Sequence, residues 1–187
     1  MNLLSSFKKI FIMGIGGSGM SSIAKYLKQK GHNVEGYDQR ISYITNLLES
    51  DGVKTCQNLD NFRYQEDVLY VISSAIDLDD TFLANYTENE NVISRPKFLE
   101  LLSEEVEILG ITGTHGKTST TALVSHIFHF NNKNASFIYG GVSGFGNLGG
   151  HFGEETQPLI LETDEAFNTF KNINIKDLIV TNIDNDH

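Results

Sequence analysis

The sequence predicts an α/β protein, a Rossmann-like parallel-sheet domain followed by a partial P-loop ATPase-like α/β domain. Short apolar runs alternate with segments of helical periodicity along the chain, and two of these runs lead into the glycine-rich turns 14–19 and 113–118. Short strands that alternate with helices indicate parallel sheets with helices on both faces. We place residues 1–104 in the first domain and residues 105–187 in the second, which we expect to be truncated.

In the first domain, four apolar runs are expected to form strands. They are Lys9–Gly14, Asn33–Tyr37, Val68–Ser73 and Asn91–Ser94. Three helices are expected, each with apolar residues at helical spacing. The first helix carries Met20, Ile23, Ala24 and Leu27 and is expected to stop at Gly31. The second carries Ile44, Leu47 and Leu48, with Ser42 as its cap and Gly52 as its stop. The third carries Phe98, Leu99 and Leu102. Pro96 suits the first turn of the third helix, because a proline there loses no helical hydrogen bond.

The second domain repeats this alternation after a short acidic hinge at Ser103–Glu107. Its expected strands are Glu107–Thr112, Ala135–Tyr139, Leu159–Glu162 and Leu178–Ile183, and its first helix carries Leu123, Ile127 and Phe130. Seven of the fourteen residues in Gly140–Gly153 are glycine. Because glycine weakens helices and strands, we expect a loop there, either a mobile loop over substrate or a plain surface loop. The chain ends directly after an apolar run, so the sequence is expected to be cut short.

Composition limits the classes of function. The 187 residues are 40% hydrophobic and 20% charged, which suits a folded core. The formal net charge of −10 argues against nucleic acid or an anionic membrane as the partner. The single cysteine, Cys56, excludes an internal disulfide and is interpreted as a small buried side chain. The apolar N-terminal run is too short to span a membrane and lacks the pattern of a signal peptide, so we expect a cytoplasmic protein.

Residues 108–121, with the sequence ILGITGTHGKTSTT, predict a site for a nucleoside triphosphate. The glycines let backbone N–H groups surround phosphate oxygens at the start of a helix. We assign ATP binding to Gly113, Thr114, His115, Gly116, Lys117, Thr118 and Ser119, the phosphate loop. The Lys117 ammonium is expected to reach the β- and γ-phosphates, and the Thr118 hydroxyl to bind Mg²⁺. Ile111 stands where the common G-x-x-x-x-G-K-[ST] pattern has its first glycine.

The segment Gly14–Gly19, the first glycine loop, fits G-x-G-x-x-G between a strand and a helix. It allows a diphosphate to approach the N-terminus of that helix. Asp38 follows the second strand, where an acidic residue commonly binds a ribose hydroxyl. These residues alone suggest NAD, but the diphosphate of a UDP-sugar fits as well. Arg40 and Arg95 also follow strands, and each is interpreted as a solvated surface cation.

Acidic and imidazole side chains follow strands or lie on a helix of the second domain. The acidic segment Glu162–Glu165 comes after an apolar run, where its carboxylates suit Mg²⁺, which prefers hard oxygen ligands. A solvated acidic loop is the alternative. His187 at the end of the chain, taken alone, is interpreted as exposed. His126 and His129 share one helix face and are interpreted as surface or packing residues, because no carboxylate or cysteine is spaced to complete a metal site.

Five segments of the chain resemble the Mur ligases, the ATP-dependent amide-forming enzymes of peptidoglycan synthesis. They are Gly14–Ala24, Val71–Ile76, T-G-T-H-G-K-T at 112–118, the acidic segment, and Thr181–His187. His115 is typical of the branch that adds L-alanine to UDP-N-acetylmuramate, since most of the superfamily has Asn at this position. Ala166 and Phe167 depart from the family pattern Glu-Ala-Asp-Glu-Ser-Asp, in which the first Glu corresponds to Glu162.

The resemblance implies the following site residues. The UDP-sugar is expected on Gly14, Gly16, Gly17, Ser18, Gly19, Met20, Asp38, Ser73, Ser74 and Ala75. Thr118 and Glu162 are implied Mg²⁺ ligands, His187 helps to bind a second Mg²⁺, and Lys117, Glu162 and His187 are the implied catalytic residues. The implied cofactors are ATP and Mg²⁺. The implied small-molecule substrates are UDP-N-acetylmuramate, ATP and L-alanine, without nucleic acid or membrane insertion, and a homodimer is left open.

In the implied reaction, the lactyl carboxylate attacks ATP, and the resulting acyl phosphate is captured by the amine of L-alanine. Three alternatives stay open. They are a murein-peptide recycling ligase that uses the same sugar nucleotide, a redox or NAD-sensing protein, and a noncatalytic module that binds a UDP-sugar or a dinucleotide. Because the sequence lacks the family's further strands and C-terminal domain, we expect these 187 residues alone to bind UDP-N-acetylmuramate but to turn over ATP poorly or not at all.

Overall fold

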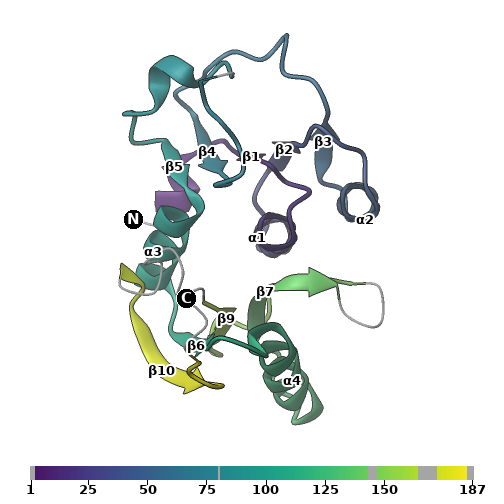
Figure 1. Cartoon of the computed structure of the whole chain (residues 1–187), viewed down its shortest axis with the longest axis vertical. Coiled ribbons are helices and arrows are strands. Elements are labelled where there is room, and N and C mark those ends of the chain that lie inside the picture. The colour runs from purple at the N-terminus through teal and green to yellow at the C-terminus, as the bar shows by residue number, and fades with distance from the viewer. Residues whose placement is uncertain (1–2, 80, 143–146, 164–171, 185–187) are drawn as a thin grey trace.

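The computed structural model describes residues 3–79, 81–142, 147–163 and 172–184. Its first sheet contains β1 (Lys9–Met13), β2 (Val34–Tyr37), β3 (Lys54–Cys56), β4 (Val68–Ile72) and β5 (Val92–Ser94). These described strands are all parallel, in the order β3-β2-β1-β4-β5 (Figure 1). This is the order of the Rossmann fold, so the predicted fold class is confirmed.

The three helices expected in the first domain are present, and local capping explains two of their starting points. They are α1 (Ser18–Gln29), α2 (Tyr43–Ser50) and α3 (Arg95–Glu105). α2 begins with a capping box, in which Ser42 Oγ accepts the Thr45 N–H and the Thr45 hydroxyl accepts the Ser42 N–H. α3 begins after Ser94, whose hydroxyl accepts the Lys97 N–H, with Pro96 in the first turn.

The short edge strand β3 was not expected from the sequence. Its three residues are exposed or half-buried, so they give no apolar run from which to predict a strand. Cys56 at its end is half-buried, and this burial raises the pKa of the thiol. The interpretation of Cys56 as a buried side chain is therefore only partly right, because the side chain is half-buried.

The second sheet contains β6 (Ile108–Thr112), β7 (Ser136–Val142), β8 (Leu148–His151), β9 (Leu159–Glu162) and β10 (Ile175–Val180). Its described strands have the order β10-β6-β9-β7-β8, and β7 and β8 are antiparallel. The helix α4 (Lys117–Phe130) packs against β6, β7 and β9. Figure 1 shows β7 between α4 and α1, the helix from the first sheet. β10 begins before the expected strand 178–183 and leaves Ile183 87% exposed.

The glycine-rich segment 140–153 is not a loop in most of its described length, so that expectation is wrong. β7 continues to Val142, and β8 pairs with β7. The glycines permit close packing, because a Cβ at Gly150 would overlap the backbone carbonyl of Ser22 in α1. Residues 143–146 of this segment lie outside the described residues.

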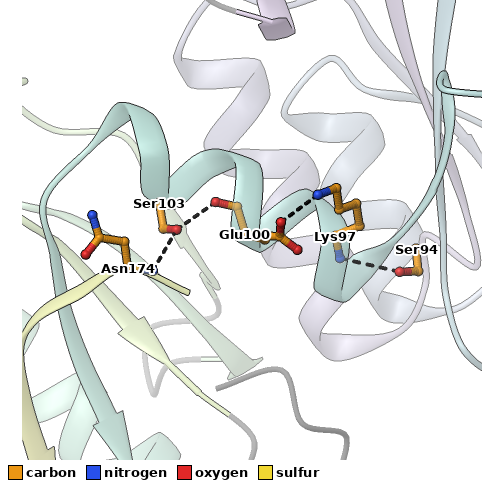
Figure 2. Close-up of polar contacts among 5 residues, drawn as sticks. All are labelled: Ser94, Lys97, Glu100, Ser103 and Asn174. Atoms are coloured by element: carbon orange, nitrogen blue, oxygen red, sulfur yellow. Dashed lines mark hydrogen bonds and ion pairs between the residues drawn. The ribbon is translucent and has the colours of Figure 1, made fainter. Parts of the chain in front are cut away.

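Polar contacts along α3 connect the two sheets (Figure 2). Lys97 and Glu100 form an ion pair one turn apart. The Ser103 hydroxyl donates to the Glu100 carbonyl at 2.6 Å and accepts the N–H of Asn174 at 2.9 Å. Since Asn174 immediately precedes β10, the C-terminal half of α3 is attached to the second sheet.

The connection between the sheets is shorter than expected. α3 continues to Glu105, so only Val106 and Glu107 of the expected hinge 103–107 are not helical. Lys30, just after α1, lies 3.4 Å from Glu105, and both side chains are more than four-fifths buried. The domain boundary between residues 104 and 105 stays a prediction.

One hydrophobic core extends across both sheets. It includes Ile12 and Leu27 from the first sheet and its helix, together with Ile138, Leu148 and Leu161 from the second sheet. All five side chains are at most 2% exposed. Separating the two sheets would expose these side chains to water, at a cost of roughly 25 cal/mol per Å² of apolar surface. The shared core therefore holds the two sheets in a fixed relation.

The apolar stripe that marked α4 in the sequence does not face the described core. Leu123, Ile127 and Phe130 are 59%, 50% and 79% exposed. The helix instead buries Thr121 and Ser125 against the sheet. No helix within the described residues combines the length and apolar character needed to cross a membrane.

Gly150→Ala is expected to destabilise the protein, because the new Cβ would overlap the Ser22 carbonyl and separate α1 from β8. We expect the free energy of unfolding to fall by about 2–4 kcal/mol. Urea denaturation followed by circular dichroism measures this change. The control Asn147→Ala, at an exposed residue just before β8, should change it by less than about 0.5 kcal/mol. Equal stability of the two variants would contradict the close approach.

Candidate functional site

The loop between β6 and α4 has the geometry of an anion-binding turn. Gly113 and Gly116 have φ angles of 132° and 80°, which other residues rarely adopt. No described side chain caps the N-terminus of α4, which begins at Lys117. The Lys117 ammonium donates to the carbonyls of Gly113 at 2.6 Å and Thr114 at 3.3 Å. The predicted loop residues 113–119 therefore gather at the first turn of α4, with a cation held against them.

Two predicted Mg²⁺ ligands are in direct contact. Thr118 Oγ1 donates to Glu162 Oε1 at 2.7 Å, and the Gly140 N–H donates to Glu162 Oε2 at 2.6 Å. The pairing of β6 with β9 sets Glu162 beside Ile111, directly before the phosphate loop. A hydroxyl and a carboxylate are hard oxygen donors and suit Mg²⁺, whose other ligands are typically phosphate oxygens and water. This chemistry matches the described residues, among which no three His, Cys, Asp or Glu could hold a metal alone.

The segment after β10 holds the phosphate loop in place, a role that the sequence analysis missed. Asn182 Oδ1 accepts the His115 N–H at 2.9 Å, and Asn182 Nδ2 donates to the His115 carbonyl at 3.0 Å. The Thr181 hydroxyl donates to the same carbonyl at 2.6 Å. The Asp184 N–H donates to Thr114 Oγ1 at 3.0 Å. The available signal was a Thr-Asn pair inside the expected strand 178–183.

The first glycine loop is stabilised by Asp38. Asp38 Oδ2 accepts the Gly16 N–H at 2.9 Å, and Oδ1 accepts the Arg40 N–H at 3.1 Å. A Cβ at Gly16 would lie 2.7 Å from Asp38 Oδ2, which explains why glycine occurs there. Gly14 has a φ of 79°, and no described side chain caps α1 at its N-cap residue, Gly17. The carboxylate of Asp38 thus supports the loop that presents the start of α1.

A cavity of about 410 Å³ lies at the carboxyl ends of β4 and β5. Its polar lining includes Ser73, Ser74 and Arg95. The Arg95 guanidinium packs against the first glycine loop, because a Cβ at Gly19 would lie 3.0 Å from Arg95 Cζ. Arg95 Nε is buried and has no hydrogen-bond partner among the described residues. The interpretation of Arg95 as a solvated surface cation is therefore wrong, whereas Arg40 is exposed as expected.

Two of the expected sugar-nucleotide residues have their side chains elsewhere. Met20 is 3% exposed and belongs to the hydrophobic core, so only its backbone is available to a ligand. Ala75 donates its N–H to Ser73 Oγ at 3.3 Å and lies beside the cavity rather than in its lining.

The two loops converge at Gly140 in β7. A Cβ at Gly140 would lie 3.4 Å from Ser18 Oγ and 3.6 Å from Glu162 Oε2, so this one residue lies between the first glycine loop and Glu162, a predicted Mg²⁺ ligand. The Ser22 hydroxyl, one turn further along α1, donates to the carbonyl of Tyr139 at 2.7 Å. The start of α1 and the start of α4 therefore border one site.

Other predicted residues lie outside the described part of the chain or away from this site. His187 and residues 164–167 lie outside the described residues, so their assigned roles stay predictions. His126 and His129 are exposed on α4, as the sequence indicated, and no hydrogen bond joins either one to the phosphate loop within the described part of the chain.

Asn182→Ala is expected to release the phosphate loop, because both hydrogen bonds to His115 disappear. The loss of about 1 kcal/mol should speed hydrogen exchange at the His115 amide roughly fivefold. Asn182→Asp keeps an acceptor for this N–H and should retain most of the protection. The Thr163 amide, which donates to the Ile111 carbonyl, is the internal reference. Unchanged exchange at His115 in the alanine variant would contradict the assignment.

Comparison with known proteins identifies the family. The family model described as Mur ligase family, catalytic domain, matches residues 9–107, about half of the chain. A UDP-N-acetylmuramate–L-alanine ligase of Cytophaga hutchinsonii is 31% identical over 98% of this chain and 42% of its own length. A ligase of the same name from a Hydrogenobaculum species is 35% identical over 97% of this chain and 40% of its own length. The chain thus spans about two-fifths of the curated relatives that it matches.

Solved structures agree with this comparison. UDP-N-acetylmuramate–alanine ligase from Thermotoga maritima superposes with a TM-score of 0.79 and 29% identity, over 96% of this chain and 42% of that protein. The Neisseria UDP-N-acetylmuramate:L-alanyl-γ-D-glutamyl-meso-diaminopimelate ligase shares the fold, with a TM-score of 0.78 and 22% identity over 97% of this chain and 62% of that protein. The family model matches more than half of the chain, and curated relatives exceed 30% identity. The chain therefore belongs to the Mur ligase family.

Proposed function

We propose that this chain is the N-terminal part of an ATP-dependent ligase that joins L-alanine to the carboxylate of UDP-N-acetylmuramate in peptidoglycan synthesis. The observation that carries the proposal is the convergence of the two loops, with Gly140 between Ser18 and Glu162. A ligase of this kind has to bring a sugar-nucleotide carboxylate to the γ-phosphate of ATP. Two anion-binding turns that border one site meet this requirement.

The first glycine loop is the proposed site for the diphosphate of the sugar nucleotide. The N-terminus of α1 offers backbone N–H groups and a partial positive charge, and the Arg95 guanidinium adds a full one. Ser73 and Ser74 line the neighbouring cavity and offer hydroxyl donors. The NAD alternative loses support because the chain belongs to the Mur ligase family. Asp38 does not decide between the two ligands, since each of its oxygens accepts one backbone N–H and keeps a further lone pair.

The phosphate loop is the proposed ATP site. Residues 113–119 would surround the β- and γ-phosphates, and Lys117 would exchange its loop carbonyls for phosphate oxygens. Thr118 and Glu162 would hold Mg²⁺. When bound, Mg²⁺ neutralises phosphate charge and fixes the orientation of the transferring group.

In the proposed reaction, an oxygen of the lactyl carboxylate attacks the γ-phosphorus of ATP, the bond to the bridging β–γ oxygen breaks, and ADP leaves. The amine of L-alanine then attacks the acyl carbon, the bond from that carbon to the phosphate oxygen breaks, and the nitrogen loses a proton as phosphate leaves. Lys117 and the start of α4 would stabilise negative charge on the phosphoryl oxygens. Positioning and charge neutralisation therefore supply the catalysis, without a nucleophilic side chain.

The choice of L-alanine rests on the names of the relatives with 31–35% identity. The recycling ligase is the second candidate, because the fold shared with the Neisseria enzyme would present the same two loops. Both candidates use the same sugar nucleotide and ATP, so both require the first glycine loop and the phosphate loop as binding sites.

Glu162→Gln and Thr118→Ala are expected to weaken Mg-ATP binding by at least about tenfold, because each removes an oxygen ligand of the metal. Affinity for UDP-N-acetylmuramate should change little. Isothermal titration of the 187-residue chain with each compound, with and without EDTA, measures both. Glu107→Gln is the matched control, since this carboxylate lies before β6, at the opposite end of the strand from the phosphate loop. Unchanged Mg-ATP affinity in Glu162→Gln would remove the proposed ATP site.

Arg95→Gln is expected to weaken the binding of UDP-N-acetylmuramate by roughly tenfold or more, because a charged donor against the first glycine loop is lost. Titration calorimetry measures the affinity, and Mg-ATP titration of the same variant should give the value of the unmodified protein. Arg63→Gln is the control, as Arg63 is exposed and donates to the backbone carbonyls of Asp60 and Phe62. Equal losses in both arginine variants would indicate a general charge effect and contradict the site.

A further inference from the structure

A second cavity, of about 620 Å³, lies between α4 and the β7–β8 pair. It does not include the residues of the two loops described above. α1 packs against β7 and β8 as well, and Figure 1 shows β7 between α1 and α4, so the cavity lies on the α4 side of this strand pair. Its volume is typical of small-molecule sites, which are commonly about 300–1,000 Å³.

The sheet side of this cavity is a row of flat rings. Phe137 and Tyr139 are two residues apart on β7, and their rings stack with centroids 5.5 Å apart and planes 22° apart. His151 on β8 is paired with Phe137, and its ring stacks on Phe137 at 5.2 Å and 30°. Rings stacked in this way turn their faces toward one another and leave their edges to the cavity that they line. A planar aromatic ligand complements a row of ring edges, because its face can pack on them in the edge-to-face arrangement.

The helix side presents polar groups from one face of α4. Ala122, Ser125, His126 and His129 have the spacing i, i+3, i+4 and i+7, and all four line the cavity. The chain then turns at the end of the helix and adds Lys133 to the same lining. Two exposed imidazoles and one ammonium therefore border the open part of the cavity.

The charge of the lining is opposite to that of the whole protein. The chain has 24 acidic residues and a net charge of −10, yet none of the described residues that line this cavity is acidic. Lys133 has no ion pair with any described residue, so its ammonium is available to a ligand. The two imidazoles are not part of a group of three possible metal ligands among the described residues.

His151 is held in one orientation by Asn134. Its Nε2 lies 2.8 Å from Asn134 Oδ1, and since the amide oxygen only accepts, the imidazole donates from Nε2. Burial lowers the pKa of His151, and the nearby Lys25 and His129 lower it further. The lowered pKa favours the neutral ring, which stacks on Phe137.

We propose that this cavity binds a small planar aromatic anion, with its ring on the Phe137–Tyr139–His151 surface and its acidic group at Lys133 and His129. The row of ring edges suits the flat face of an aromatic ligand, and Lys133, in a lining whose described residues include no carboxylate, suits its negative charge. This site is separate from the proposed sites for ATP and the sugar nucleotide. It adds a ligand class that the proposed ligase reaction does not use.

The test uses 1-naphthalenesulfonate as the probe, titrated into the ¹⁵N-labelled 187-residue chain and followed by NMR. We expect saturable shifts at the amides of Ser125, His129, Phe137 and His151, without shifts in the phosphate loop or the first glycine loop. Uncharged 2-naphthol should bind at least about tenfold more weakly, because it lacks the anionic group, and sulfate should bind similarly weakly, because it lacks the ring.

Two variants divide the site into its parts. Lys133→Ala, at an exposed residue, should weaken naphthalenesulfonate binding about tenfold, whereas the control Lys54→Ala on β3 should not change it. Phe137→Leu should weaken naphthalenesulfonate and naphthol alike, with circular dichroism checking the fold. Equal binding of naphthol and naphthalenesulfonate, shifts located at the phosphate loop, or full affinity in Lys133→Ala would each overturn the proposal.

Discussion

The packing of α1 against β7 and β8 is the contact on which the rest of the structure depends. α1 follows the first glycine loop, whereas β7 lies beside Glu162 and the phosphate loop. The Ser22 hydroxyl bonds to the Tyr139 carbonyl, and Gly150 allows the Ser22 backbone to approach β8 without a Cβ between them. If this contact were wider by one side chain, the first glycine loop and the phosphate loop would no longer border a single site.

Apolar burial rather than polar pairing supplies most of this contact. The shared core continues through Leu27 and Leu148, and Tyr26 packs edge-on against Phe152 with ring centroids 5.7 Å apart. Tyr26 is fully buried, and its hydroxyl has no partner among the described residues, which is a local cost. The contact tolerates this cost because the surrounding apolar area is large.

Local patterns predicted most strands and both glycine-containing turns, because apolar alternation and glycine positions are properties of neighbouring residues. They failed where the partner is distant in sequence. Because glycine weakens a strand in isolation, segment 140–153 was predicted to be a loop. In the structure most of its described residues form strands, and Gly150 permits β8 to approach Ser22 closely. Arg95 was interpreted as a surface cation because its contact, Gly19 on α1, is likewise distant in the sequence. The support that Asn182 gives to the phosphate loop likewise requires β10 to lie beside β6.

The helix starts distinguish the two helices at the proposed ligand sites from the other two. α2 and α3 begin with Ser42 and Ser94, whose hydroxyls accept N–H groups of the first turn. α1 and α4 instead have Gly17 and Gly116 as N-caps, and no described side chain caps either helix. A serine cap satisfies donors that an anion would otherwise use, so glycine leaves those donors to a ligand at a cost in isolated helix stability. The starts of α1 and α4, with the cations Arg95 and Lys117 beside them, therefore offer local positive potential to the proposed phosphates although the chain has a net charge of −10.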